Sequence, residues 1–104
     1  MKDHENLNFE SMCVHAGIDA DEFGAVVPPI YQTSTFKFKS AQHGAALFSG
    51  EGKGHIYTRM SNPTIEAMED SVAALEGGVK AMGCASGMAA INTVFATFLG
   101  AGSH

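Results

Sequence analysis

The chain has 104 residues, of which 45% are hydrophobic and 16% are charged, a balance that is typical of a globular protein and not of a disordered one. Its net charge is −5 with only six basic side chains, which argues against nucleic acid or an anionic membrane surface as the main partner. The two cysteines, Cys13 and Cys84, indicate no disulfide framework. No signal segment opens the chain, and no apolar run reaches the ~20 residues that span a bilayer, so we expect a cytoplasmic location.

The first residues carry few structural signals. Residues 1–12 are polar and predict a loose terminus. Cys13 and His15 lie two residues apart, but one such pair lacks the ligand count of a zinc site, and we predict no metal. The acidic residues 19–24 are typical of a solvated loop.

The next segment is predicted to be extended. Two prolines restrict the backbone of residues 26–30, and the threonines and aromatic residues of 31–38 predict a strand. Prolines directly before that strand favour an edge or an arm over a central position. Ser40 can cap a short helix through Leu47, and the alternating glycines of residues 50–54 indicate a flexible surface loop, since their spacing does not fit a nucleotide-binding loop.

Tyr57 and Arg59 form the first candidate binding pair, and Arg59 is the only arginine of the chain. In an extended backbone the two side chains would share one face. A phenol hydroxyl beside a planar guanidinium suits a phosphate. The alternative is a surface arginine next to a half-buried tyrosine, and the spacing alone favours this alternative.

An amphipathic helix follows. Asn62 suits its N-cap and Pro63 its first position, and Gly77-Gly78 ends it with a left-handed turn. Its apolar residues recur at helical spacing, which predicts that they pack in a core. These residues are Ile65, Met68, Val72 and Leu75.

A short strand and a second helix are predicted next. Residues 79–84 are apolar enough for a buried strand, and Ser86 can cap a helix from Gly87 to Leu99 that is apolar on most sides and therefore expected to be buried. Helix, strand and helix in succession predict an α/β layered fold. A strand with no successor leaves the edges of a sheet unsatisfied, so the sequence looks truncated.

The turn before this second helix is the other candidate binding element. The first N–H groups of a helix have no partner within it, and the helix dipole adds positive charge there. We expect this turn to share one anion, a cofactor phosphate, with Tyr57 and Arg59.

Other chemistries at this turn fit less well. A serine hydrolase needs Gly-x-Ser-x-Gly, whereas Ser86 lies in Gly-Cys-Ala-Ser-Gly. A nucleophilic Cys84 would need an exposed, electropositive setting. Its place at the end of an apolar strand favours a buried structural thiol.

The motifs of the chain, taken in order from about Cys13 to the end, resemble the Cys/Met-metabolism family of pyridoxal-phosphate enzymes. That family includes methionine γ-lyase, cystathionine γ-synthase, cystathionine γ-lyase and β-lyase, and O-acetylhomoserine sulfhydrylase. The matching motifs are His15-Ala16-Gly17, Pro28 to Phe36, Tyr57-x-Arg59, Asn62-Pro63-Thr64, Leu75-Glu76-Gly77-Gly78 and Ala85 to Ala90. Residues 48–57 look most like methionine γ-lyase or O-acetylhomoserine sulfhydrylase, and we favour the lyase.

The resemblance implies the N-terminal portion of a fold-type I enzyme. Residues 1–60 would form an extended arm with a cofactor-clamp segment, and residues 61–104 the first helix-strand-helix of the α/β large domain. The implied cofactor is pyridoxal 5′-phosphate, and the implied substrate is a sulfur amino acid that undergoes γ-elimination or γ-replacement. Asn62-Pro63-Thr64 would be structural, as the entry to a helix.

The family's site residues can be carried over to matching positions. Backbone N–H groups of Gly87 and Met88 would bind the cofactor phosphate, with Ser86 at the start of that helix. Tyr57 and Arg59 would reach the same phosphate from the neighbouring subunit of a dimer, usually within a tetramer. Tyr57 would also be catalytic, in proton transfer or departure of the leaving group.

Other parts of the family's site have no match in this chain. They are the Schiff-base lysine, the aromatic residue that stacks on the pyridine ring, the aspartate that pairs with the ring nitrogen and the arginine that binds the substrate carboxylate. We therefore expect the 104 residues to be inactive alone. The alternatives are a fragment of O-acetylhomoserine sulfhydrylase, cystathionine γ-synthase or cystathionine γ-lyase, or a natural short chain that is a non-catalytic interaction module.

Overall fold

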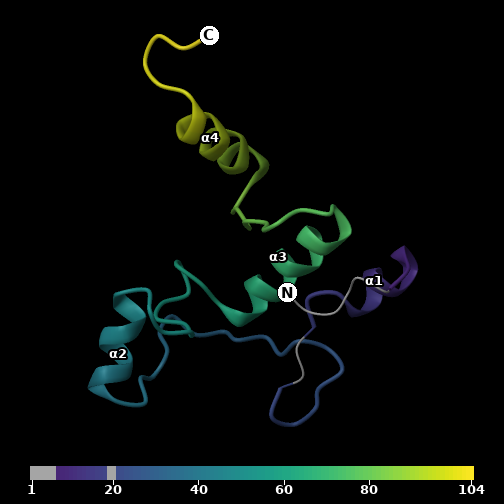
Figure 1. Ribbon diagram of the computed structural model, residues 1–104, viewed down its shortest axis with the longest axis vertical. Helices are drawn as coiled ribbons and strands as arrows, with labels where there is room; N and C mark the ends of the chain where they lie inside the picture. Colours follow the sequence, from purple (N-terminus) through teal and green to yellow (C-terminus); the bar gives the residue numbers. More distant parts are fainter. Residues whose placement is uncertain (1–6, 19–20) are drawn as a thin grey trace.

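The computed structural model describes residues 7–18 and 21–104. Along these residues lie four helices: α1 (Phe9–His15), α2 (Ala41–Phe48), α3 (Pro63–Leu75) and α4 (Gly87–Phe98) (Figure 1). None of them is long and apolar enough to cross a membrane. The segments between the helices are turns and extended backbone, and the β-bridge found within them pairs Thr35 with Tyr57 in antiparallel fashion.

Every one of these helices begins at a side chain that accepts a hydrogen bond from a backbone N–H of the first turn. Such a cap satisfies a donor that the helix itself leaves without a partner. The caps are Asn8 to Ser11 N, Ser40 to His43 N, Asn62 to Thr64 N and Ser86 to Ala89 N. The predicted caps at Ser40, Asn62 and Ser86 are thereby confirmed, as is the left-handed turn at Gly77, whose φ is +63°.

The prediction of a loose N-terminus is wrong for the end of that segment. Residues 9–15 form α1, because Asn8 caps the helix and Glu10 places an acid in its first turn. Residues 1–6 of the predicted loose terminus, and residues 19–20 of the predicted acidic loop, lie outside the described residues.

The two predicted strands are also absent from the part of the chain that the structure describes. Residues 31–38 contribute only the single bridge at Thr35, and residues 79–84 form no bridge. A strand needs backbone partners on a neighbouring strand. Within residues 7–18 and 21–104, no second extended segment pairs with residues 79–84. The sheet layer of the expected α/β fold is therefore not formed here.

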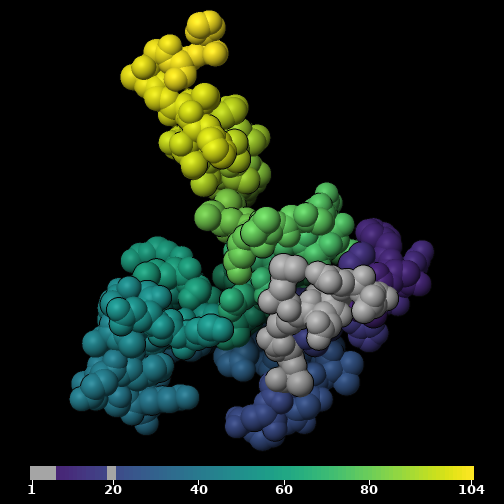
Figure 2. All heavy atoms as spheres, in the orientation of Figure 1, coloured from purple at the N-terminus to yellow at the C-terminus, as the bar shows by residue number. Residues whose placement is uncertain are grey.

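The predicted burial of α4 is a third correction. The helix contains no buried residue, and Phe95 and Phe98 keep 57% and 79% of their surface exposed. Figures 1 and 2 show the reason, since α4 projects away from the other three helices. The radius of gyration is 16.4 Å, against about 13 Å for a compact domain of this size.

The apolar positions of α3 and the thiol of Cys84 are likewise more exposed than predicted. Ile65, Met68 and Val72 each keep 40% or more of their surface, and Cys84 is exposed. In α3 the buried position is Ala73. A helical stripe of apolar residues becomes core only where another element covers it, and these residues of α3 are covered only in part.

That contact joins α1 to α3 through the turn that follows α1. Gly17 has a φ of +71° and is buried directly against α3. Ser71 Oγ of α3 donates a hydrogen bond of 2.6 Å to the carbonyl oxygen of Ala16. Ala16 and Ala73 are both 8% exposed or less, so small residues allow the two helices to approach closely.

Candidate functional site

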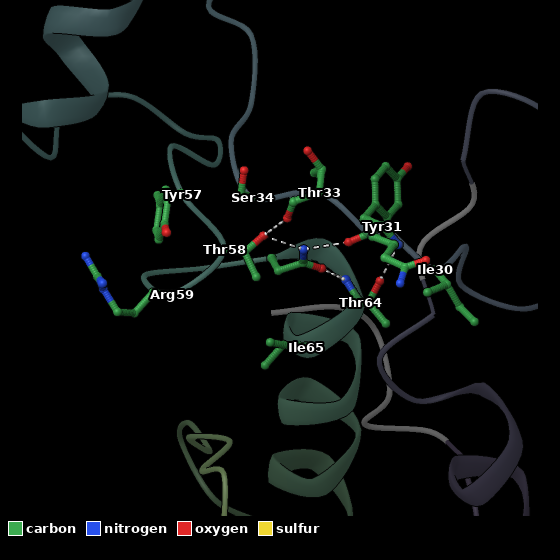
Figure 3. A pocket seen from close by; sticks show the side chains of 11 residues that line it. Ile30, Tyr31, Thr33, Ser34, Tyr57, Thr58, Arg59, Thr64 and Ile65 are labelled. Carbon is green, nitrogen blue, oxygen red and sulfur yellow. Dashed lines mark hydrogen bonds between the residues drawn. The ribbon is translucent and has the colours of Figure 1, made fainter.

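An open pocket of about 950 Å³ lies between the extended arm and the start of α3. One wall is formed by residues 30–34 of the arm, and the other by residues 57–59 with Asn62, Thr64 and Ile65. Figure 3 shows Tyr57 and Arg59 together at one side of this pocket and Tyr31 and Ile30 at the other. The pocket thus combines a cationic group with hydroxyl groups from two segments far apart in the sequence.

Tyr57 and Arg59 lie in contact, as predicted, but not by way of a regular strand. The Arg59 guanidinium carbon is 5.0 Å from the centroid of the Tyr57 ring, a distance that allows a cation–π interaction. The backbone turns directly after Tyr57, whose carbonyl oxygen accepts from the N–H groups of Met60 and Ser61 at 2.8 and 3.1 Å. Tyr57 is half-buried and Arg59 is exposed, so the guanidinium can reach a ligand from outside.

Asn62 lines this pocket and is only 3% exposed. Its Nδ2 donates to the carbonyl oxygen of Tyr31 at 2.9 Å and to Thr58 Oγ1 at 3.0 Å. Its Oδ1 accepts from Thr64 N at 2.9 Å, which caps α3. One side chain therefore joins the arm, the turn that carries Arg59 and the start of α3.

Two threonine hydroxyl groups extend this connection. Thr64 Oγ1 accepts from Tyr31 N and donates to the Pro29 carbonyl oxygen, both at 2.9 Å. Thr58 Oγ1 donates to the Thr33 carbonyl oxygen. Figure 3 draws the bonds among the pocket residues as dashed lines. The sequence reasoning recognised Asn62 and Thr64 as the start of a helix but missed their bonds to the arm, about 30 residues earlier.

The other predicted binding element lies at the N-terminus of α4. Ser86 Oγ accepts from Ala89 N at 3.1 Å, and the N–H groups of Gly87 and Met88 make no hydrogen bond to another described residue. A Cβ added at Gly87 would meet no atom within 4 Å, so the space beside this residue is open. Residues 86–88 do not line the pocket of Tyr57 and Arg59, and a single chain does not bring the two predicted elements together.

A second group of polar residues lies on the other side of the turn. His55 Nδ1 is 2.9 Å from Ser61 Oγ, and His55 Nε2 is 3.5 Å from Glu66 Oε2. Lys80 Nζ lies 3.4 Å from Asp70 and 4.0 Å from Glu66. The sequence reasoning missed this serine, histidine and glutamate. Because the His55–Glu66 distance exceeds that of a good hydrogen bond, we interpret the group as support for the turn.

The comparisons with known proteins agree on one family. Residues 10–104 match the family described as Cys/Met metabolism PLP-dependent enzyme. The L-methionine gamma-lyase of Pseudomonas deceptionensis is 45% identical over 102 residues, which cover 97% of this chain and 26% of the lyase. The O-acetyl-L-homoserine sulfhydrylase of Corynebacterium glutamicum is 41% identical over 110 residues, which cover 100% of this chain and 25% of the sulfhydrylase.

A solved structure supports the same conclusion. The crystal structure of metB from Corynebacterium glutamicum superposes with a TM-score of 0.82 at 36% identity, over 98% of this chain and 25% of that one. The chain therefore spans about a quarter of the length of the curated relatives that it matches. The family match covers nearly all of its residues, as the motifs indicated, and the chain belongs to the family of Cys/Met metabolism PLP-dependent enzymes.

Proposed function

We propose that this chain is the N-terminal part of a pyridoxal-phosphate enzyme that acts on a sulfur amino acid by γ-elimination or γ-replacement, most like methionine γ-lyase. The observation that carries the proposal is the contact of Tyr57 with Arg59 on the wall of an open pocket. Membership of the family supplies the chemical context, and the similarity to an L-methionine gamma-lyase supports the choice of reaction.

The groups present fit the phosphate of pyridoxal 5′-phosphate. Arg59 offers a planar fork of N–H donors, and within residues 7–18 and 21–104 no carboxylate forms an ion pair with it. Gly87 and Met88 offer two N–H groups at the positive end of a helix of 12 residues. Both sets of donors are open to a ligand.

The two sets of donors would meet on one phosphate between two copies of the chain. Within one copy, residues 86–88 lie outside the pocket of Tyr57 and Arg59, and α4 projects away from it (Figure 1). This separation supports the proposal that Tyr57 and Arg59 act in the neighbouring subunit of a homodimer. Pairing of two such dimers into a tetramer is proposed from the family resemblance alone.

Each residue then has a distinct task. Pyridoxal phosphate, when bound, supplies the electron sink for bond changes in the substrate. Arg59 neutralises and fixes the phosphate, while Ser86 caps α4 and keeps the N–H groups of Gly87 and Met88 aligned. Tyr57 is the catalytic residue of this chain, because its phenol oxygen can hold or pass a proton beside the substrate.

The proposal also covers the organisation of the chain. Residues 1–60 serve as arm and cofactor clamp, and residues 61–104 begin the α/β large domain. The Schiff-base lysine belongs to another part of the enzyme, and the 104 residues are inactive by themselves. Lys80 supports this view, since its ammonium group lies between Asp70 and Glu66. A cytoplasmic location stays a prediction.

A second candidate reaction is γ-replacement by an O-acetylhomoserine sulfhydrylase. The sulfhydrylase of Corynebacterium glutamicum aligns with the whole of this chain at 41% identity, close to the 45% of the lyase. Assays of the purified protein with L-methionine, and with O-acetyl-L-homoserine plus sulfide, distinguish the two reactions directly.

The first test is the intact mass of the protein as its source cell makes it, together with its affinity for pyridoxal phosphate. We expect a mass several times 10.9 kDa and a bound cofactor. A mass of 10.9 kDa with no affinity for pyridoxal phosphate would contradict the proposal.

The second test removes the arginine. In that protein, Arg59→Ala should raise the Kd of pyridoxal phosphate about 10- to 150-fold, because a charge-assisted hydrogen bond contributes this much. Arg59→Lys is the matched control, since it keeps the charge but loses the planar fork of donors. Its Kd should lie between those of the unaltered protein and Arg59→Ala. An unchanged Kd in Arg59→Ala would remove Arg59 from the site.

A further inference from the structure

Asn62 makes more hydrogen bonds than a helix cap needs. Capping α3 requires only its Oδ1, which accepts from Thr64 N. Serine and aspartate cap helices about as well as asparagine. The two hydrogen bonds of Nδ2, to Tyr31 and Thr58, are therefore not needed for the cap and instead join the arm and Thr58 to the start of α3.

The directions of these bonds are fixed by the protons available. The Tyr31 carbonyl oxygen can only accept, so the Asn62 atom facing it must be the donor Nδ2. Thr58 Oγ1 gives its single proton to the Thr33 carbonyl oxygen and accepts from Asn62. No other orientation of the amide satisfies all three contacts of a side chain that is 3% exposed.

Thr58 is the residue between Tyr57 and Arg59, and it is held from both of its polar sides. Its N–H donates to the Ser34 carbonyl oxygen at 2.9 Å, and its hydroxyl is shared between Thr33 and Asn62. The exposed Arg59 is thus attached to a backbone that the arm and α3 hold at Thr58.

We propose that Asn62 is a positioning residue, which acts through Thr58 to hold Tyr57 and Arg59 where they receive a phosphate. This inference rests on the proposed function, in which Tyr57 and Arg59 bind the cofactor phosphate. Asn62 does not touch the cofactor. Its side-chain amide fixes the backbone from which both phosphate ligands extend, and it does so at the point where the arm crosses the start of α3.

The experiment compares pyridoxal 5′-phosphate with pyridoxal, which lacks the phosphate, on the apo-enzyme in the protein as its source makes it. The ratio of the two Kd values reports the phosphate contacts alone. Asn62→Asp keeps the cap oxygen and loses both Nδ2 donors. Thr58→Val keeps the shape of the side chain and loses the hydroxyl, while Thr58→Ser keeps the hydroxyl and is the matched control.

We expect Asn62→Asp and Thr58→Val each to raise the Kd of pyridoxal phosphate about three- to tenfold, with the Kd of pyridoxal unchanged. Each variant loses two hydrogen bonds, but the expected change equals only about one, because the loss reaches the phosphate indirectly, through the backbone at Thr58. Thr58→Ser should retain the ratio of the unaltered protein. If Asn62→Asp fails to fold, the ratio of the two Kd values in Thr58→Val, compared with that in Thr58→Ser, still tests the positioning role.

Arg59→Ala is measured beside these variants to separate two failures. If Arg59→Ala changes the ratio while Thr58→Val and Asn62→Asp do not, the positioning role is wrong and the phosphate site stands. If both Kd values rise equally in Thr58→Val, the network supports only the fold, and the inference is overturned. If Arg59→Ala itself leaves the ratio unchanged, the proposed function fails, and the inference fails with it.

Discussion

The replacement Gly17→Ala tests how closely the turn after α1 packs against α3. A Cβ at Gly17 would lie within 3.0 Å of the Ala67 carbonyl oxygen, of Ser71 Oγ and of Ser71 N. Two of these three atoms belong to the α3 backbone, which cannot move aside as a side chain can. The φ of Gly17 is +71°, which any other residue adopts at a cost.

The expected destabilisation is the sum of three effects. A left-handed backbone costs alanine about 1–2 kcal/mol, and overpacking against α3 costs about 1–3 kcal/mol. Separation of the helices would also weaken the hydrogen bond from Ser71 Oγ to Ala16, worth about 1 kcal/mol. We expect a loss of about 3–6 kcal/mol in the free energy of unfolding, a large part of the stability of an ordinary domain.

Urea unfolding followed by circular dichroism measures this loss in the protein as its source makes it. Gly77→Ala is the matched control, because Gly77 has a similar φ of +63° while a Cβ there meets no atom within 4 Å. It should lose only about 1–2 kcal/mol, the backbone effect alone. Equal losses in Gly17→Ala and Gly77→Ala would contradict close packing of Gly17 against α3, since no packing effect would remain.

Three smaller changes test other local interactions. Ser86→Ala should lower the free energy of unfolding by about 1 kcal/mol and weaken pyridoxal-phosphate binding, whereas Ser86→Asp keeps the cap and the stability. Equal stability of the two variants would contradict a contribution of the hydrogen bond from Ala89 N to the side chain of residue 86. Leu47→Ala should lower the free energy of unfolding in urea by about 2–4 kcal/mol, because Leu47 is 8% exposed and its side chain covers Gly54. A loss under about 1 kcal/mol would show that burial of Leu47 does not contribute to stability. Lys80→Gln should change the free energy of unfolding by less than about 1 kcal/mol, since the ion pairs of Lys80 are exposed. A larger loss would mean that these ion pairs stabilise the fold more than surface pairs usually do.

Much of the local structure follows from short sequence signals. Ser40, Asn62 and Ser86 each begin a helix as predicted, because a capping side chain and its N–H partner are at most three residues apart. The helix at residues 9–15 was missed although the same signal, Asn8, precedes it. Polar composition outweighed the cap in that prediction.

The candidate site was predictable in its parts and not in its assembly. A shared face of Tyr57 and Arg59 was expected only for an extended backbone, and a turn after Tyr57 brings the two side chains into contact instead. The bonds from Asn62 and Thr64 to the arm join residues 31 and 33 positions apart, and no periodicity or propensity encodes such a pairing. The family, by contrast, could be predicted from the sequence, because its motifs are short runs of neighbouring residues.

The sequence by itself determined the helix starts, the glycine turns, the family and the types of side chain that we propose to bind a phosphate, because each of these depends on residues close together in the chain. The tertiary structure alone decided which segments meet. It placed the arm across the start of α3, buried Asn62 there and left α4 exposed with 79–84 unpaired. Burial and strand pairing are properties of two surfaces in contact, so an apolar helix or a strand-like segment cannot establish them without a partner.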